Sequence, residues 1–146
     1  MRGKHWLVIS LLLAAADQAL KLVFKDAQAV VLPGVLALHG TRNTGAAFSM
    51  LSGSPWLVLL ASLLLMAVLV IFAHQMRQHR LLSFSLAMIF GGALGNLADR
   101  LLRGYVVDFL ELLFVQFPIF NFADILITVG AGLAALAVLR LPGEQS

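Results

Sequence analysis

The stretch that decides the fold is PWLVLLASLLLMAVLVIFA, residues 55–73. It contains no charged residue, and the charge-free interval around it extends from Arg42 to Arg77. An α-helix needs about twenty apolar residues to cross the hydrocarbon core of a bilayer. The stretch therefore predicts a membrane-spanning helix, and residues 81–98 form a second uncharged run of similar length.

Two further apolar segments carry a few charges near one end. Residues 6–24 are apolar except for Asp17 and Lys21, and residues 122–139 carry only Asp124. Lipid leaves no partner for unpaired backbone groups, and these long runs lack the alternation of barrel strands. The sequence therefore predicts an all-α polytopic membrane protein forming one domain, residues 1–146. The expected helices cover about 6–24, 55–73, 81–98 and 122–139.

The composition excludes several classes of protein. Of 146 residues, 61% are apolar and 12% are charged, whereas soluble domains carry about 25% charged residues. A net charge of +3 does not make the basic stripe of a nucleic-acid-binding protein. The absence of cysteine excludes disulfides and thiolate ligands. The four His form no metal-binding motif, so we expect neither metal nor cofactor.

The N-terminus allows two interpretations. Arg2 and Lys4, an apolar stretch and the small residues 14–16 imitate a cleavable signal peptide. The apolar character continues to Phe24, however, and this longer run fits the thickness of a bilayer. We therefore expect a retained helix.

The charges in the connections indicate on which side of the membrane the termini lie. Lys and Arg are equally numerous on the two sides of the predicted membrane, so the positive-inside rule gives a tie. Every Asp and Glu except Glu144 falls on the side of the two long connections, residues 25–54 and 99–121. Basic residues paired with those acids count less as cytoplasmic anchors. We therefore expect both termini and the loop 74–80 in the cytoplasm, and the functional groups on the opposite face.

The first long connection favours short strands around the turn Pro33-Gly34. It then reaches Asn43-Thr44-Gly45-Ala46-Ala47-Phe48. Small residues there permit close approach of the backbone to a substrate, and they equally suit a tight turn that returns the chain to the membrane.

Polar residues near the ends of two predicted helices share a face. Asp17 and Lys21 are spaced for an i, i+4 pair, which indicates a structural ion pair at the outer rim or a catalytic role. Asn96 and Arg100 have the same spacing around Asp99. They point either to recognition of carbonyl or carboxylate groups or to a lipid-headgroup anchor.

Asp108 and Asp124 both lie in apolar surroundings at the ends of the second long connection. A connection that leaves one span and returns as the next can bring them face to face. The start of a helix favours an ionised Asp124, whereas apolar surroundings favour a protonated Asp108. Such a pair can hydrolyse an amide by acid–base catalysis. The alternative is that each pairs with Arg100, Arg103 or Lys21, or belongs to an ion path.

Read in order, five blocks of this chain resemble the lipoprotein signal peptidases (signal peptidase II). The blocks are DQALK at 17–21, NTGAAF at 43–48, GNLADR at 95–100, GYVVDF at 104–109 and FNFAD at 120–124. The resemblance implies that Asp108 and Asp124 are the catalytic pair. It also implies that Asp17 and Lys21 shape the site. The expected site-lining residues are Asn43, Gly45, Asn96, Arg100 and Asn121.

The resemblance further implies the substrate, a diacylglyceryl-modified prolipoprotein cut before its lipidated cysteine. It implies a bacterial inner-membrane enzyme with its site at the extracytoplasmic face. It also implies that the first connection forms a small sheet cradling the substrate and that residues 99–121 include a short interfacial helix. The expected partners are the prolipoprotein and membrane lipids, without nucleic acid, and we expect a monomer. A transporter or proton channel fits less well, because the two middle spans carry no charge.

Overall fold

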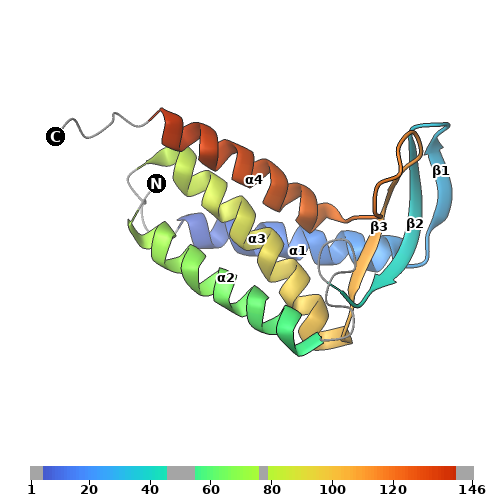
Figure 1. Ribbon diagram of the computed structural model, residues 1–146, viewed down its shortest axis with the longest axis horizontal. Helices are drawn as coiled ribbons and strands as arrows, with labels where there is room; N and C mark the ends of the chain where they lie inside the picture. The colour runs from blue at the N-terminus through green and yellow to red at the C-terminus, as the bar shows by residue number, and fades with distance from the viewer. Residues whose placement is uncertain (1–4, 46–54, 76–78, 141–146) are drawn as a thin grey trace.

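Four helices run side by side and alternate in direction, with a small sheet across one end (Figure 1). The computed structural model describes residues 5–45, 55–75 and 79–140. The helices are α1 His5–Phe24, α2 Pro55–Gln75, α3 Arg80–Arg103 and α4 Phe122–Leu139. The first residue of α1 and the last residue of α4 lie at the end away from the sheet. The helix positions predicted from the charge-free runs are close to those observed.

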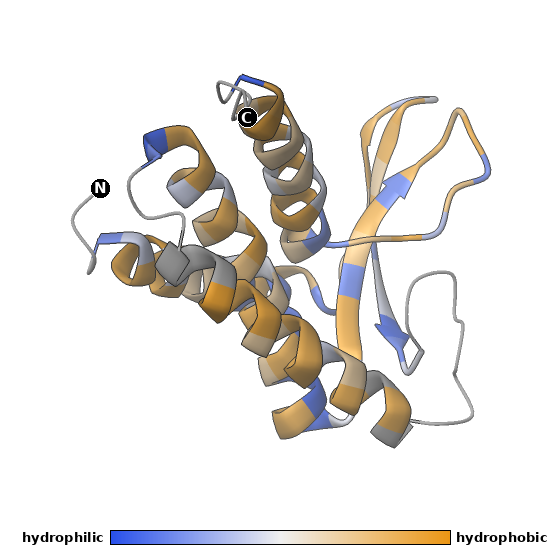
Figure 2. Cartoon of the chain, turned by 60° about the vertical axis from the view of Figure 1, so that its left-hand side comes forward, coloured by the Kyte–Doolittle hydropathy of each residue, from blue (hydrophilic) through white to orange (hydrophobic). Residues whose placement is uncertain are grey.

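Most residues of the helices are hydrophobic (Figure 2), and many of their large side chains are exposed. Three helices, α1, α3 and α4, are long and apolar enough to cross a membrane, and the described part of α2 contains the apolar stretch Leu59–Ile71. In α3, 67% of the apolar window is buried, against 22% in α1 and in α4. The helix α3 is therefore the central element, and the outer faces of its neighbours suit lipid.

Close approach of the helices depends on glycines of α3. A Cβ atom on Gly92 would collide with the carbonyl oxygen of Ala123 in α4. A Cβ atom on Gly95 would collide with the carboxylate of Asp17 in α1. These two positions let α1 and α4 pack against α3 at the depth of the polar groups described below.

The sheet is antiparallel and has the strand order β1-β2-β3. Its strands are β1 Gln28–Leu32, β2 Leu36–Asn43 and β3 Val106–Leu112. The hairpin between β1 and β2 turns at Gly34, whose φ of 71° is a left-handed conformation that glycine adopts without strain. Strand β2 pairs with β3 so that Thr41 lies opposite Asp108. The predicted strands around Pro33-Gly34 are thus present, and the second connection supplies the third strand.

One prediction for residues 99–121 is wrong, because this segment contains no short interfacial helix. Its first part continues α3 to Arg103, where Gly104 ends the helix at a φ of 78°. The next part is β3, in which Val106, Val107 and Phe109 are residues that favour strands. The backbone of β3 hydrogen-bonds to β2, and Leu110 also pairs with Phe120. These bonds occupy the groups that a helix would need.

Candidate active site

A pocket of about 360 Å³ lies at the sheet end of the helices, and both predicted catalytic carboxylates line it. The other polar lining residues are Asn43, Asn96, Arg100, Asn121 and Thr128. The apolar lining residues are Val106, Phe117, Pro118, Ile119, Phe120 and Ile127. The pocket therefore combines a polar centre with an apolar wall built from α4 and the segment after β3.

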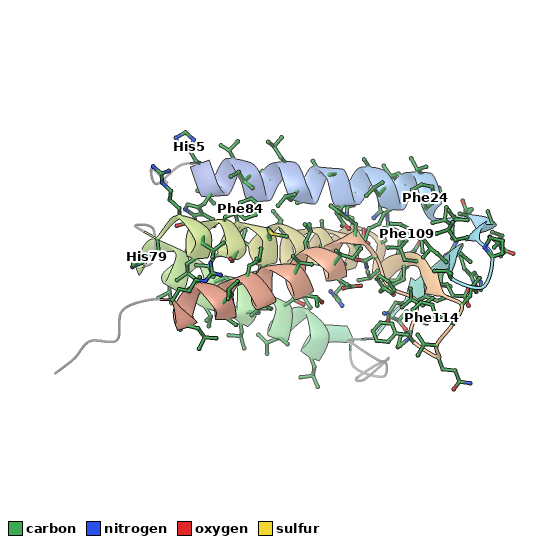
Figure 3. All side chains as sticks on the ribbon, turned by 90° about the horizontal axis from the view of Figure 1, so that it is seen from above. His5, Phe24, His79, Phe84, Phe109 and Phe114 are labelled. Carbon is green, nitrogen blue, oxygen red and sulfur yellow. The ribbon has the colours of Figure 1, made fainter. Side chains whose placement is uncertain are left out.

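Strand β3 delivers Asp108 to the pocket. Its neighbours Val107 and Phe109 are buried, and Asp108 itself is 3% exposed. The ring of Phe109 packs on Phe24, the last residue of α1, with the ring centres 5.3 Å apart. Figure 3 shows both rings at this end of the helices. The ring contact of Phe109 thus holds strand β3 against the end of α1.

The first turn of α4 delivers Asp124. Asn121 caps this helix: its side-chain Oδ1 accepts the backbone N–H of Asp124 at 3.0 Å. The Oδ2 atom of Asp124 in turn accepts the backbone N–H of Asn121 at 3.1 Å. This capping box places Asp124 at the positive end of the helix dipole, where a negative charge is stabilised.

Two amide side chains hold Asp108. Asn121 Nδ2 donates to Asp108 Oδ1 at 2.6 Å, and Asn43 Nδ2 donates to Asp108 Oδ2 at 2.9 Å. Because the Oδ1 atom of Asn43 accepts the backbone N–H of Gly45 at 2.9 Å, its NH₂ group faces Asp108. Asn121 thus touches both carboxylates, one through its cap and the other through its amide.

A third amide holds Asp124. Asn96 Nδ2 donates to Asp124 Oδ1 at 3.0 Å. The Oδ1 atom of Asn96 accepts from Asn121 Nδ2 at 3.2 Å and from Lys21 Nζ at 2.8 Å. The amides of Asn96 and Asn121 therefore form a bridge between the two carboxylates.

The pocket changes the acidity of Asp108. Burial raises the pKa of Asp108 to about 6, and the nearby charge of Asp124 acts in the same direction. The hydrogen bonds from Asn43 and Asn121 oppose this rise. A group with this pKa carries a proton in an appreciable fraction of molecules near neutral pH, as an acid catalyst requires.

Arg100 adds a positive charge to the pocket wall. Its guanidinium donates to the carbonyl oxygens of Asn96 at 3.3 Å and Gly45 at 3.4 Å. Gly45 itself is buried. The remaining small residues of that block, 46–48, lie outside the described residues.

Asp17 and Lys21 lie outside the pocket lining, and each is 0% exposed. Lys21 Nζ is 2.8 Å from Asp17 Oδ2 and 3.1 Å from Asp99 Oδ2. Arg103 also pairs with Asp99. None of the ion pairs among the described residues includes Asp108 or Asp124. The cations proposed as alternative partners for those two acids thus pair elsewhere or, like Arg100, donate to carbonyl oxygens.

Sequence reasoning assigned no site role to Gln18, Asp99 and Arg103, which join the hydrogen bonds and ion pairs around Lys21. Asp99 was grouped only with its helical neighbours, whereas it contacts Lys21 across the helix interface. Gln18 donates to Asp99 Oδ1 at 3.1 Å and accepts from Arg103 at 3.1 Å. Asp99 and Arg103 could have been found from their charge at the end of an apolar run, since charged groups there need partners. Within residues 5–45, 55–75 and 79–140, no three His, Cys, Asp or Glu side chains gather to hold a metal ion.

Comparisons with known proteins agree with the sequence blocks. Residues 9–140 match the model of a family described as "Signal peptidase (SPase) II". A lipoprotein signal peptidase of Pseudomonas fluorescens (strain Pf0-1) is 41% identical over 148 residues, which cover 92% of this chain and 87% of that protein. One from Shouchella clausii (strain KSM-K16) is 37% identical over 138 residues, covering 90% of this chain and 91% of that protein.

Solved structures include similar folds. One, described as a bacterial membrane enzyme at 2.3 Å resolution, has a TM-score of 0.80 and 27% identity and covers 97% of this chain and 92% of its own. Another, described as a bacterial membrane enzyme at 1.9 Å, has a TM-score of 0.75 and 28% identity, with 94% of both chains covered. The arrangement of helices and sheet is therefore shared with membrane enzymes.

Proposed function

This chain belongs to the signal peptidase II family, and from that premise we propose that it is an aspartic endopeptidase acting on diacylglyceryl-modified prolipoproteins. It removes the signal peptide by cutting the bond before the lipidated cysteine. The substrate has acyl chains in the bilayer and a peptide at its surface. A pocket with a polar centre and an apolar wall suits both parts of such a molecule.

The observation that carries the mechanism is the sharing of one pocket by Asp108 and Asp124, with Asn121 hydrogen-bonded to both. Asp124 acts as the base, because the start of α4 stabilises a negative charge there. Asp108, whose pKa is raised to about 6, acts as the acid. The pair differs in environment, and such a difference is what divides the acid and base roles between two carboxyl groups.

The reaction follows from these roles. Asp124 takes a proton from a water molecule, and the oxygen of that water bonds to the carbonyl carbon of the scissile peptide. Asp108 gives its proton to the carbonyl oxygen in the same step. The proton held by Asp124 then passes to the leaving nitrogen as the C–N bond breaks, and Asp108 recovers its proton from the hydroxyl group that becomes the new carbonyl. The products are a carboxyl end on the signal peptide and a free amine on the lipidated cysteine.

We assign the polar lining residues two tasks: to bind the substrate and to hold the pair Asp108 and Asp124, which we call the dyad. Asn43, Asn96 and Asn121 hold the carboxylates through the hydrogen bonds described above. Arg100 lines the pocket and is held by the carbonyl oxygen of Gly45, and its guanidinium can donate to a carbonyl oxygen of the substrate.

We further propose the placement of the protein in the membrane. All four helices cross the bilayer as a single domain, with both termini in the cytoplasm. The sheet and the pocket lie at the extracytoplasmic face of the inner membrane, and the protein acts as a monomer. Support comes from the alternating direction of the helices and from the position of the sheet at the end away from the start of α1 (Figure 1).

A cleavage assay with two substrates tests the function. The purified protein is incubated in detergent with a lipidated prolipoprotein and with the same prolipoprotein lacking the diacylglyceryl group. We expect cleavage of the lipidated form alone, immediately before the modified cysteine. Cleavage of neither form, or of both at equal rates, would contradict the proposal.

A further inference from the structure

Three charged residues between α1 and α3 form a buried unit that the hydrolytic mechanism leaves unused. Asp17, Lys21 and Asp99 are each 0% exposed. The ammonium of Lys21 contacts both carboxylates, at 2.8 Å and 3.1 Å. We call these three residues the clamp. Since none of them lines the pocket, their connection to it must run through other groups.

Each clamp carboxylate binds the main chain next to one of the two pocket carboxylates. Asp99 Oδ2 accepts the backbone N–H of Val107 at 3.0 Å, and Val107 immediately precedes Asp108. Asp17 Oδ1 accepts the backbone N–H of Ala123 at 2.9 Å, and Ala123 immediately precedes Asp124. One ammonium therefore connects the two backbone positions from which the pocket carboxylates project.

The ammonium makes a third contact that points directly at the pocket. Lys21 Nζ donates to Asn96 Oδ1 at 2.8 Å. An ammonium has donors only, so it fixes the oxygen of the Asn96 amide toward itself. The NH₂ group of Asn96 then faces Asp124 Oδ1, at 3.0 Å. Lys21 thus fixes, together with the hydrogen bond from Asn121 Nδ2 to the same oxygen, which end of this amide Asp124 meets.

The charges of the clamp balance once Arg103 is counted with it. Two carboxylates, Asp17 and Asp99, face two cations, Lys21 and Arg103, the latter paired with Asp99. Opposite charges attract more strongly where water is excluded, and the loss of one partner leaves the others uncompensated. The three clamp residues are fully buried, and a charge-compensated group of this kind holds its members in one arrangement, as a positioning device requires.

We propose that the clamp sets the separation and orientation of Asp108 and Asp124, with Lys21 as the positioning residue. The inference rests on the hydrolytic function proposed above. Two carboxyl groups that share one water and one carbonyl must be placed accurately, and a displacement of about 1 Å costs about 100-fold in rate. The clamp fixes that placement from behind the pocket without touching the substrate.

The test compares Lys21→Met with Lys25→Met, the same substitution one turn further along α1. Lys25 is exposed at the surface and is 3.9 Å from Asp26. Turnover of a lipidated prolipoprotein is measured in detergent, with kcat and KM determined separately and thermal unfolding recorded for each variant. We expect Lys21→Met to lower kcat by about 100-fold with KM unchanged, because the dyad moves and the pocket wall does not. Lys25→Met should match the unaltered protein in both constants.

Two conservative variants separate positioning from mere folding. Lys21→Arg keeps the positive charge, and Asp99→Asn keeps an oxygen for the N–H of Val107. Lys21→Arg should recover part of the kcat lost in Lys21→Met. Asp99→Asn should recover part of the kcat lost in Asp99→Ala. If Lys21→Met yields no folded protein, Lys21→Arg replaces it in the test. A folded Lys21→Arg variant with lowered kcat and unchanged KM supports the clamp.

The contrary outcomes are distinct. Folded Lys21 variants that melt at a lower temperature yet turn over as fast as the unaltered protein would make the cluster structural only and overturn the clamp. If Asp108→Asn is inactive in the same experiment, the proposed hydrolytic function survives that result. Normal turnover by Asp108→Asn would instead reject the proposed function.

Discussion

Two pairs of carboxylates lie at the sheet end of the helices, Asp17 with Asp99 and Asp108 with Asp124, and their partners differ. Asp17 and Asp99 bind the cations Lys21 and Arg103. The pocket carboxylates receive neutral amide groups instead, from the side chains of Asn43, Asn96 and Asn121. The first pair is fully enclosed, whereas the second borders a pocket of about 360 Å³.

The difference in partners shows that carboxylates serve two purposes in this small membrane protein. A cation cancels the charge of a carboxylate and locks it in place. An amide orients a carboxylate without cancelling its charge, and at Asp108 burial raises the pKa to about 6 although two amides are bound to it. Substitutions in the pocket should therefore affect the rate first, and substitutions in the ion cluster should also affect stability.

The largest effect is expected from Asp108→Asn and Asp124→Asn. Each change removes a titrating group while nearly keeping its shape, so we expect kcat to fall by about 1,000-fold or more with the protein still folded. The measurement is cleavage of a lipidated prolipoprotein together with thermal unfolding. Glu111→Gln is the matched control, since Glu111 lies on the same strand as Asp108 and pairs with His39 outside the pocket lining. A near-normal rate in either Asn variant would refute the dyad.

Asp17→Ala should show the structural side of the comparison. It leaves Lys21 with one carboxylate and the N–H of Ala123 without its acceptor, and the expected loss of stability is about 3–5 kcal/mol. Thermal unfolding in detergent measures it, with Asp26→Ala at the exposed end of the Lys25 pair as control. An unchanged melting temperature would contradict this structural role of Asp17.

Two Gly→Ala changes, one beside the ion cluster and one in the hairpin turn, should have smaller effects on stability and rate. At Gly95 the new Cβ would press on the carboxylate of Asp17, so we expect a loss of about 1–3 kcal/mol from overpacking and a lowered kcat. At Gly34 the space is open and only the positive φ is strained, which costs about 1 kcal/mol and leaves kcat unchanged. Equal kinetics in the two variants would argue against transmission from the ion cluster to the pocket.

The smallest effect is a shift in pH dependence. Asp108 must be protonated to act as an acid, so kcat/KM should decline as the pH rises above about 6. Asn43 stabilises the charged form of Asp108 and thereby lowers its pKa. Asn43→Ala should raise that pKa and move the declining limb upward by about one pH unit, the equivalent of one hydrogen bond. A limb that stays in place or moves down would contradict the assignment of Asp108 as the acid.

Much of the fold follows from the distribution of charge along the chain. The charge-free runs predicted the helices well, because a helix in lipid must be apolar over its whole length. The end of α3 was placed too early, at Ala98, since Asp99 and Arg100 look like an interfacial boundary. The structure continues the helix to Arg103, because Asp99 is neutralised inside the bundle by Lys21 and Arg103.

Contacts between elements could not be predicted from spacing. Helical periodicity relates Asp17 to Lys21 on one helix, but it does not relate Lys21 to Asp99 or to Asn96 on another. Strand β3 was missed because its pairing with β2 joins segments far apart in the chain, although Val106 and Val107 favour a strand. The positions of Asp108 and Asp124 followed from the resemblance of the sequence blocks, and their hydrogen-bonding amides required the structure.

The most direct test of the central claim is the turnover of the Asp108→Asn/Asp124→Asn double variant beside the two single variants. Carboxylates that work as one unit lose nearly all their contribution when either is removed. The account therefore predicts that the double variant is no slower than the slower single variant. Losses that multiply in the double variant would show two independent contributions and contradict a shared dyad.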